Sequence, residues 1–200
     1  MDDVRYYVAL VTFISFPPPL LCWFLVHPFA DKWRRIGVVP CYMFLTAFLV
    51  LAMIWLWTVR DLALDSEFGT HWSLVTVSLI PFGAGIYLRV LWARTMKKST
   101  LLGLDELKGT GGPEALVTTG IHGQIRHPRY VEGFLVLVGL AAFANYLVLY
   151  LLALAYIPLI LLVVLLEERE LRDRFGQAYE DYAAQVPRFI PSRQTPGNAS

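Results

Sequence analysis

The chain has 200 residues, of which 56% are hydrophobic, and its mean hydropathy is +0.53. This is far too apolar for an ordinary soluble domain of the same length, which disfavours a soluble helical bundle. Seventeen basic and sixteen acidic residues nearly cancel, so the net charge gives no reason to expect a nucleic-acid partner. We predict an all-α, polytopic membrane protein that forms a single domain over residues 1–200.

Three apolar stretches of membrane length lie within residues 1–93. They run from Tyr6 to Val26, from Ile36 to Val59 and from Trp72 to Trp92, close to the ~20 residues that a helix needs to cross the hydrocarbon. Two acids precede the first stretch and no clear small-residue cleavage site follows it, so we expect it to remain in the mature protein. The proline run at 17–19 removes backbone donors, which predicts a bend or break in the first helix.

A polar loop, residues 94–130, follows these three stretches and is too long for a mere connector. From Pro128 the chain is apolar to Leu166, and one helix over this length would measure about 58 Å, too long for a single crossing. We therefore predict a helical hairpin that turns near Asn145 within the C-terminal part, residues 131–200. This gives about five transmembrane helices in all.

The distribution of lysine and arginine predicts the orientation in the membrane. The first and third connections and the segment after Leu166 are basic or heavily charged, whereas the second connection and the Asn145 turn are not. Five spans with the amino terminus outside satisfy this pattern. The polar loop and the segment after the last span then lie together on the cytoplasmic face.

The end of the polar loop, Gly120 to Tyr130, gathers residue types that bind anions. Proline is favoured at the first position of a helix, so Pro128 is expected to begin the fourth span, with His127 near its cap. The free backbone N–H groups and the positive dipole end there suit a carboxylate or another anion beside Arg126. An interfacial anchor is the alternative, since Arg, His and Tyr are common at headgroup depth.

A second charged cluster follows the last span. Side chains four residues apart meet on a helix, and three such pairs are available: Glu168 with Arg172, Glu170 with Arg174, and Arg169 with Asp173. Glu167 is the one acid that these pairings leave without a partner, and it stands where the apolar stretch ends. An unpaired carboxylate at a membrane boundary predicts a functional role, and its charge would complement a cation.

Three residues are candidates for catalysis: Arg126, His122 and Glu132. His122 is a candidate general base, although a loop histidine is more often solvated. Glu132, one turn into the fourth span, must be neutral, paired with Arg129 or Arg126, or directed into a cavity. No metal site is expected, because Cys22 and Cys41 lie in apolar stretches and nothing has the spacing of zinc ligands.

Several linked motifs resemble the isoprenylcysteine carboxyl methyltransferase family, which is related to phospholipid methyltransferases. They are L-V-T-T-G-I-H-G-Q-I-R-H-P-R-Y, an apolar hairpin with Asn145 at its turn, E-E-R-E-L-R-D-R-F-G-Q-A-Y-E-D-Y and V-P-R-F-I-P. The resemblance covers about Leu116 to Pro191. It implies methyl transfer from S-adenosylmethionine in a cytoplasmic pocket formed by the polar loop and the last two helices.

The resemblance also implies a set of cofactor-binding residues. Carried over by position, they are Leu116, Val117, His122, His127, Pro128, Arg129, Tyr130 and Glu167. The chain departs from the family pattern at three places. His122 stands where the family usually has tyrosine, Glu114 where its prenylcysteine enzymes often have histidine, and Val163 where those enzymes carry the arginine that pairs with the substrate carboxylate.

The resemblance implies a lipophilic carboxylate, isoprenylcysteine-like, or a related small molecule as the methyl acceptor in the lipid bilayer. Because Val163 replaces the substrate arginine, the acceptor can differ even where the cofactor does not. The alternative is a non-catalytic membrane assembly factor or transporter-like protein that retains the fold. A transporter should carry polar residues at mid-membrane in several spans, and this chain has almost none. The sequence does not indicate an oligomeric state.

Overall fold

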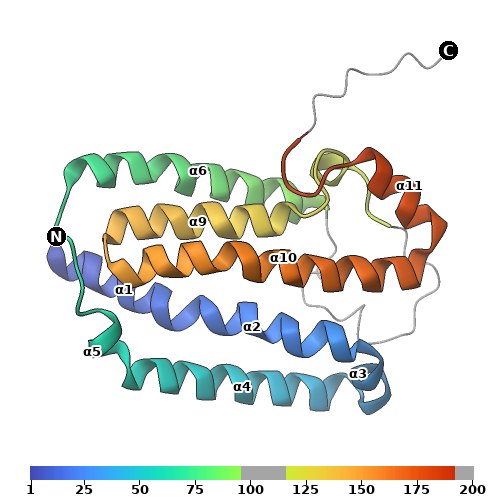
Figure 1. Cartoon of the computed structure of the whole chain (residues 1–200), viewed down its shortest axis with the longest axis horizontal. Helices are drawn as coiled ribbons and strands as arrows, with labels where there is room; N and C mark the ends of the chain where they lie inside the picture. The colour runs from blue at the N-terminus through green and yellow to red at the C-terminus, as the bar shows by residue number, and fades with distance from the viewer. Residues whose placement is uncertain (96–115, 192–200) are drawn as a thin grey trace.

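A computed structural model describes residues 1–95 and 116–191, and within these ranges the chain is helical and has no strand. The long helices run side by side along one direction (Figure 1). The elements are α1 (Asp2–Ser15), α2 (Pro17–Val26), η1 (His27–Phe29), α3 (Ala30–Ile36), α4 (Val38–Thr58), α5 (Arg60–Ala63), α6 (Trp72–Thr95), η2 (Gly120–Gly123), α9 (Pro128–Ala144), α10 (Leu147–Phe175) and α11 (Gln177–Gln185).

Four helical segments of the described chain are long and apolar enough to cross a membrane: Asp2–Phe29, Val38–Thr58, Trp72–Thr95 and Leu147–Phe175. The remaining long helix, α9, has 17 residues. At 1.5 Å per residue it is about 26 Å long, and it forms the short first arm of the hairpin with α10. The prediction of an all-α, polytopic membrane protein is therefore confirmed.

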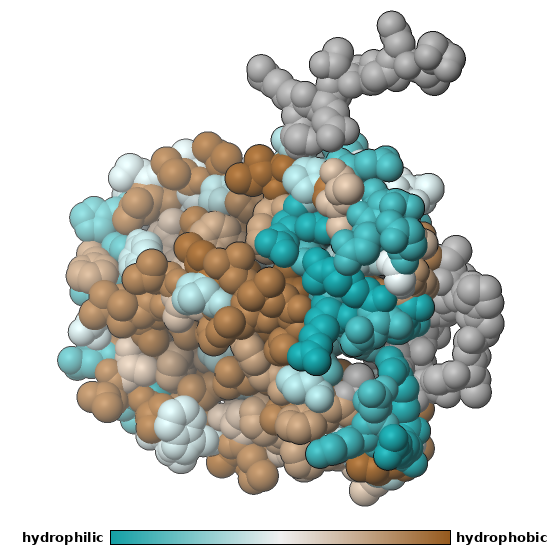
Figure 2. Space-filling model, turned by 45° about the vertical axis from the view of Figure 1, so that its right-hand side comes forward, coloured by the Kyte–Doolittle hydropathy of each residue, from teal (hydrophilic) through white to brown (hydrophobic). Residues whose placement is uncertain are grey.

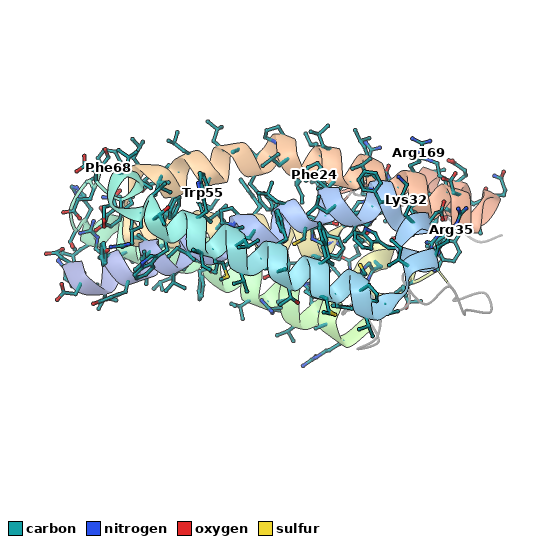
Figure 3. All side chains as sticks on the ribbon, turned by 90° about the horizontal axis from the view of Figure 1, so that it is seen from below. Phe24, Lys32, Arg35, Trp55, Phe68 and Arg169 are labelled. Carbon is teal, nitrogen blue, oxygen red and sulfur yellow. The ribbon has the colours of Figure 1, made fainter. Side chains whose placement is uncertain are left out.

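The surface divides as a membrane protein requires. On the face that Figure 2 shows, apolar residues cover most of the bundle, and hydrophilic residues gather at the end formed by α11 and its neighbours. Large side chains such as Leu51, Ile80 and Leu154 are more than half exposed on the spans, where lipid would cover them. Figure 3 shows the basic residues Lys32 and Arg35 at the same end as the C-terminal part of α10.

The proline run interrupts the first span, as predicted. Helix α1 ends at Ser15 and α2 begins at Pro17, with the prolines in its first turn. A missing N–H is tolerated there because the first-turn donors of a helix have no partner within it. The Phe16 N–H still donates to the Thr12 carbonyl oxygen at 3.0 Å, so the two helices follow one another closely.

The turn between α9 and α10 is fixed by Asn145, also as predicted. Its backbone is left-handed, with φ 59° and ψ 47°. Its amide nitrogen donates to the Gly69 carbonyl oxygen at 3.0 Å, and its amide oxygen accepts from the Tyr150 hydroxyl at 2.9 Å. The buried Arg5 donates to the carbonyl oxygen of Ala144 at 3.0 Å. These bonds attach the hairpin to the first helix and to the segment before α6.

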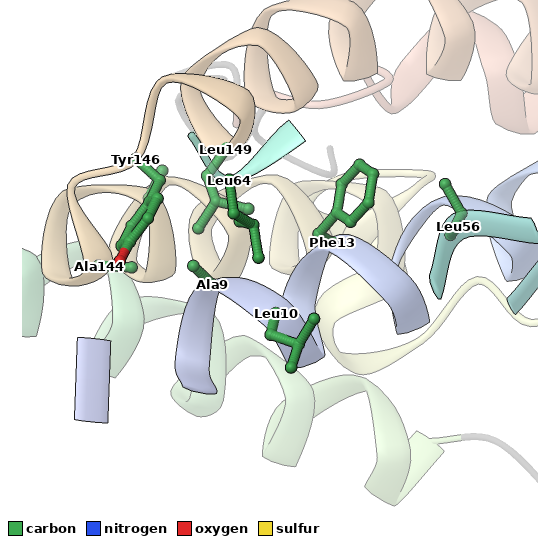
Figure 4. Close-up of a cluster of buried hydrophobic side chains, with 9 residues drawn as sticks. Ala9, Leu10, Phe13, Leu56, Leu64, Ala144, Tyr146 and Leu149 are labelled. Atoms are coloured by element: carbon green, nitrogen blue, oxygen red, sulfur yellow. The ribbon is translucent and has the colours of Figure 1, made fainter. Parts of the chain in front are cut away.

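An apolar cluster surrounds this turn and joins four helices and the turn itself (Figure 4). Its buried members include Ala9 and Phe13 of α1, Leu56 of α4 and Leu149 of α10. The cluster stabilises the end of the bundle opposite α11. The hairpin arms are thereby held in a defined register, and this register determines which side chains meet at the other end.

Helices α6 and α9 approach closely through glycine. A Cβ added at Gly139 of α9 would lie 2.9 Å from the Cβ of Phe82 and 3.0 Å from its backbone nitrogen. A Cβ added at Gly85 of α6 would lie 2.7 Å from a Val136 methyl and 3.2 Å from the carbonyl oxygen of Glu132. Small residues let helix backbones pack together within a membrane. This contact places the end of α6 beside the start of α9.

Gly139→Ala is expected to lower the free energy of unfolding by about 1–3 kcal/mol, because its Cβ would overlap the backbone of α6. Gly83→Ala is the matched control, since no atom lies within 4 Å of the added Cβ and alanine favours the helix. Thermal unfolding of both variants in detergent measures the difference. Equal melting temperatures would contradict the close packing of α6 and α9.

Candidate functional site

Three segments distant in the sequence meet at the end of the bundle that carries α11 (Figure 1). They are the loop 116–127, the C-terminal third of α10, and the segment 186–191. The N–H groups of Arg126 and His127 donate to the carbonyl oxygens of Pro187 and Arg188, at 2.9 and 3.0 Å. The segment 186–191 thereby lies against the loop immediately before α9.

The loop is also fixed against α6 and α11. Gly120 has φ +62°, and a Cβ there would lie 2.6 Å from the Thr95 methyl at the end of α6. Burial raises the pKa of Tyr182 to about 12, so this hydroxyl stays protonated. It donates to the carbonyl oxygen of His122 at 2.6 Å. Residues of two helices, Thr95 of α6 and Tyr182 of α11, thus contact the histidine.

Glu168 is the centre of the ion pairs at this end and is completely buried. The Arg188 guanidinium donates two hydrogen bonds to it, at 2.9 and 2.7 Å, and Arg126 lies at 3.1 Å. Arg172, four residues on in α10, is more distant at 3.5 Å, and His127 Nε2 lies at 3.3 Å. The predicted pair of Glu168 with Arg172 exists, but it is the longest of these contacts.

Glu167 faces a different partner. Its carboxylate accepts a hydrogen bond from the Tyr130 hydroxyl at 2.7 Å and lies 3.6 Å from His127 Nδ1. The prediction that Glu167 is unpaired is therefore wrong, because pairing along one helix does not detect a donor on the neighbouring helix. Its side chain remains 28% exposed, in contrast to Glu168. Glu167, Tyr130 and His127 form a half-open polar group, which we call the Glu167 group.

His122 lies close to this group and is buried, not solvated as a loop histidine usually is. Its Nδ1 is 3.2 Å from the Thr95 hydroxyl. Burial, and then the neighbouring His127, lower the pKa of His122 below its ordinary value. The imidazole is therefore neutral at pH 7 and available to accept a proton.

Arg126 and Tyr179 form the inner side of the site. The Arg126 guanidinium carbon lies 5.9 Å from the centre of the Tyr179 ring. Among the described residues, neither Arg126 Nε nor the Tyr179 hydroxyl has a hydrogen-bond partner, although both atoms are buried. Burial raises the pKa of Tyr179, so its hydroxyl is a protonated donor.

Arg129 and Glu132 lie away from the Glu167 group, although both are near it in the sequence. The Arg129 guanidinium carbon lies 4.9 Å from the centre of the Trp23 ring and 6.0 Å from that of Trp92. The buried Glu132 pairs with Arg89 at 3.5 Å. Of the alternatives considered for Glu132, the structure therefore shows an ion pair, but its partner is an arginine of α6 that the sequence did not indicate.

The other predicted site residues have less specific surroundings. Pro128 is buried at the first position of α9, as predicted, and Leu116 and Val117 are half-buried in the loop. Glu114 lies outside the described residues. Val163 is completely buried in an apolar cluster with Tyr130, Tyr156 and Ile160 and so offers no place for a substrate-binding cation.

Arg188, Tyr179 and Tyr182 are site residues that sequence reasoning missed. All three belong to the segments F-G-Q-A-Y-E-D-Y and V-P-R-F-I-P, which entered only as part of the family resemblance. An aromatic or arginine in a polar tail has no periodicity that indicates a partner. Within the described ranges, no group of three or more His, Cys, Asp or Glu side chains lies close enough to hold a metal ion.

Comparison with known proteins gives one match. A family model described as phospholipid methyltransferase matches residues 73–178, which is just over half of the chain and runs from α6 into α11. Searches of the curated proteins and of the solved structures found no match. The matched region contains the Glu167 group and Glu168. The chain therefore belongs to the phospholipid methyltransferase family, which makes it a membrane methyltransferase.

Proposed function

We propose that the chain transfers the methyl group of S-adenosylmethionine to an acceptor that is inserted in the lipid bilayer. The observation that carries this proposal is the Glu167 group, a half-open carboxylate held by a tyrosine hydroxyl at the polar end of an apolar bundle. Family membership supplies the reaction class. The identity of the methyl donor is inferred from the chemistry of the residues present.

The residues at this end fit such a donor, which carries a sulfonium, an ammonium and a carboxylate. The negative charge of Glu167 complements a cation, and 28% of its side chain is accessible. The unsatisfied Arg126 Nε complements a carboxylate. Leu116 and Val117 offer half-buried apolar contacts on the loop side. We therefore assign Leu116, Val117, His122, His127, Pro128, Tyr130 and Glu167 to the donor, with Arg126 beside them.

When bound, the donor supplies an electrophilic methyl group on sulfur, and the protein supplies position and charge. Tyr130 holds the Glu167 carboxylate in one orientation, so that no reorganisation is needed when positive charge is transferred. A carboxylate or thiolate acceptor needs no base. For an amine acceptor, the neutral His122 is suited to accept the proton. Holding both molecules in line supplies most of the rate.

We propose that the site faces the cytoplasm and that the amino terminus lies outside. Lys32, Arg35 and Arg169 gather at the end of the bundle that carries the site (Figure 3). At the other end, Asp2 and Glu67 pair with the buried Arg5, and Asp61 pairs with Arg60. Lysine and arginine are enriched on the cytoplasmic side of membrane proteins, which supports this orientation.

The acceptor that we propose is a lipophilic carboxylate, isoprenylcysteine-like, or a related small molecule. An arginine at position 163 would not restore recognition of such a carboxylate, because Val163 is buried among apolar side chains. A guanidinium there would lie in the packed contact between α9 and α10 and lower the stability of the hairpin. Recognition of an anionic acceptor must therefore use another residue.

Purified protein is expected to bind S-adenosylhomocysteine with micromolar affinity or better in calorimetry. It is also expected to transfer label from the methyl group of S-adenosylmethionine into one member of a panel of prenylcysteines, phospholipids and small thiols. Adenosine alone is the control and should bind more weakly, because it lacks the ammonium and carboxylate. The absence of binding heat at high ligand concentration would contradict the donor assignment.

A further inference from the structure

Arg129 is an exposed cation that contacts α2 and α6, neither of which contributes a residue to the Glu167 group. Its guanidinium lies over Trp23 of α2 and near Trp92 of α6, at 4.9 and 6.0 Å from the ring centres. Stacking on tryptophan fixes the position of an arginine without using its hydrogen-bond donors. The five N–H donors of Arg129 therefore remain available in a defined place.

No acceptor for these donors is present within residues 1–95 and 116–191: Arg129 makes no hydrogen bond and no ion pair there. Glu132, one turn on in α9, interacts with it electrostatically, but its carboxylate pairs with Arg89 at 3.5 Å. Two arginines thus share one carboxylate. These three side chains together carry one positive charge, and Arg129 itself is exposed.

Trp23 connects this cation to the Glu167 group. Besides carrying Arg129, it packs against the buried apolar cluster that contains Tyr130. Tyr130 in turn donates to Glu167. Arg129 is thus linked to the Glu167 group through one packed side chain, and it directly precedes Tyr130 in α9.

We propose that Arg129 binds the anionic group, a carboxylate or a phosphate, of the membrane-inserted methyl acceptor. This inference rests on the proposed function and assigns Arg129 to the acceptor, whereas the family resemblance alone placed it with the donor. The site would select acidic amphiphiles over neutral ones of the same chain length. It would also supply the recognition of an anionic headgroup that the buried Val163 cannot.

Three probes distinguish recognition of the anionic group from recognition of the acyl chains. They are dioleoyl phosphatidic acid, dioleoylglycerol and inorganic phosphate. Native mass spectrometry of the full chain in detergent measures the apparent Kd of each. Wild type is expected to bind phosphatidic acid at least about fivefold more tightly than dioleoylglycerol, as a charge-assisted hydrogen bond predicts. If inorganic phosphate binds as tightly as phosphatidic acid, the site takes a free anion, and the assignment to a membrane acceptor is overturned.

Arg129→Gln is expected to weaken binding of phosphatidic acid by about tenfold, and Arg129→Lys by less. Arg169→Gln is the matched control, because Arg169 is an exposed arginine at the same end of the bundle (Figure 3). Equal losses in Arg129→Gln and Arg169→Gln would reduce Arg129 to a general membrane anchor. Both variants should also bind S-adenosylhomocysteine as wild type does. A loss of this binding in Arg129→Gln alone would show that Arg129 contacts the methyl donor instead of the acceptor.

The same experiment separates the two proposals. If wild type fails to bind S-adenosylhomocysteine while Arg129→Gln still loses phosphatidic acid, the anion site exists and the methyl-donor assignment is wrong. If wild type binds S-adenosylhomocysteine and Arg129→Gln leaves phosphatidic acid binding unchanged, the donor assignment stands and this inference is wrong.

Discussion

Replacing Glu168 by glutamine is expected to lower the free energy of unfolding by about 3–5 kcal/mol, the range measured when one partner of a buried ion pair is removed. The side chain is completely buried, and three arginines and a histidine surround it. Glutamine keeps the shape but loses the charge. It leaves Arg126 without its carboxylate partner and places an amide donor against the donors of Arg188.

Thermal unfolding in detergent, followed by tryptophan fluorescence, measures this loss. The matched control is Glu180→Gln, which removes a half-exposed acid that pairs with Arg172 at 2.9 Å on the surface. An exposed pair contributes about 1 kcal/mol or less, so the control should melt close to wild type. A Glu168→Gln variant that melts like Glu180→Gln would show that the buried network contributes little to stability.

The reason for the large effect is that Glu168 joins segments that are distant in the sequence. Arg126 belongs to the loop before α9, and Arg188 to the segment after α11. Both bind the same carboxylate of α10. Without it, the segment 186–191 loses both hydrogen bonds of Arg188 and keeps its backbone hydrogen bonds and the packing of Phe189. We therefore expect this variant to lose cofactor binding as well, through loss of structure.

The sequence predicted the parts of this fold that local rules govern. Apolar length identified the spans, the proline run identified the break at Phe16, and Asn145 identified the hairpin turn, since each depends on residues adjacent along the chain. The i, i+4 rule likewise identified Arg172 as a partner of Glu168. Each of these features can be read within one helix or one turn.

The ion-pair network could not be predicted in the same way, because its partners are distant in the sequence. Arg188 lies 20 residues from Glu168, and the Tyr130 that binds Glu167 lies 37 residues away. The packing of α9 against α10 brings Tyr130 to Glu167, and the backbone hydrogen bonds between the loop and the segment 186–191 bring Arg188 to Glu168. Arg129 is the opposite case: it is adjacent to Tyr130 in the sequence, but its side chain does not contact the same partners. Consecutive side chains on a helix differ by about 100° in direction, so Arg129 faces α2 and α6 instead of α10.

Glu167→Gln is expected to weaken S-adenosylhomocysteine binding by about tenfold or more, while the melting temperature stays close to that of wild type. The reason is that Glu167 is partly open and its described partners are neutral or shared, so its charge is used for a ligand more than for the fold. A charge-assisted contact to a bound ammonium contributes about 1.5–3 kcal/mol, which corresponds to this loss.

Calorimetry and thermal unfolding on the same preparations distinguish this effect from that of Glu168. Glu168→Gln should lose binding and stability together, whereas Glu167→Gln should lose binding alone. Tyr130→Phe provides the intermediate case, because it removes the 2.7 Å hydrogen bond but leaves the carboxylate charge in place. Its binding loss should be smaller than that of Glu167→Gln. If Glu167→Gln binds as wild type does, the carboxylate at the end of the last span has only a structural role, and the donor must be held by Arg126 and the loop.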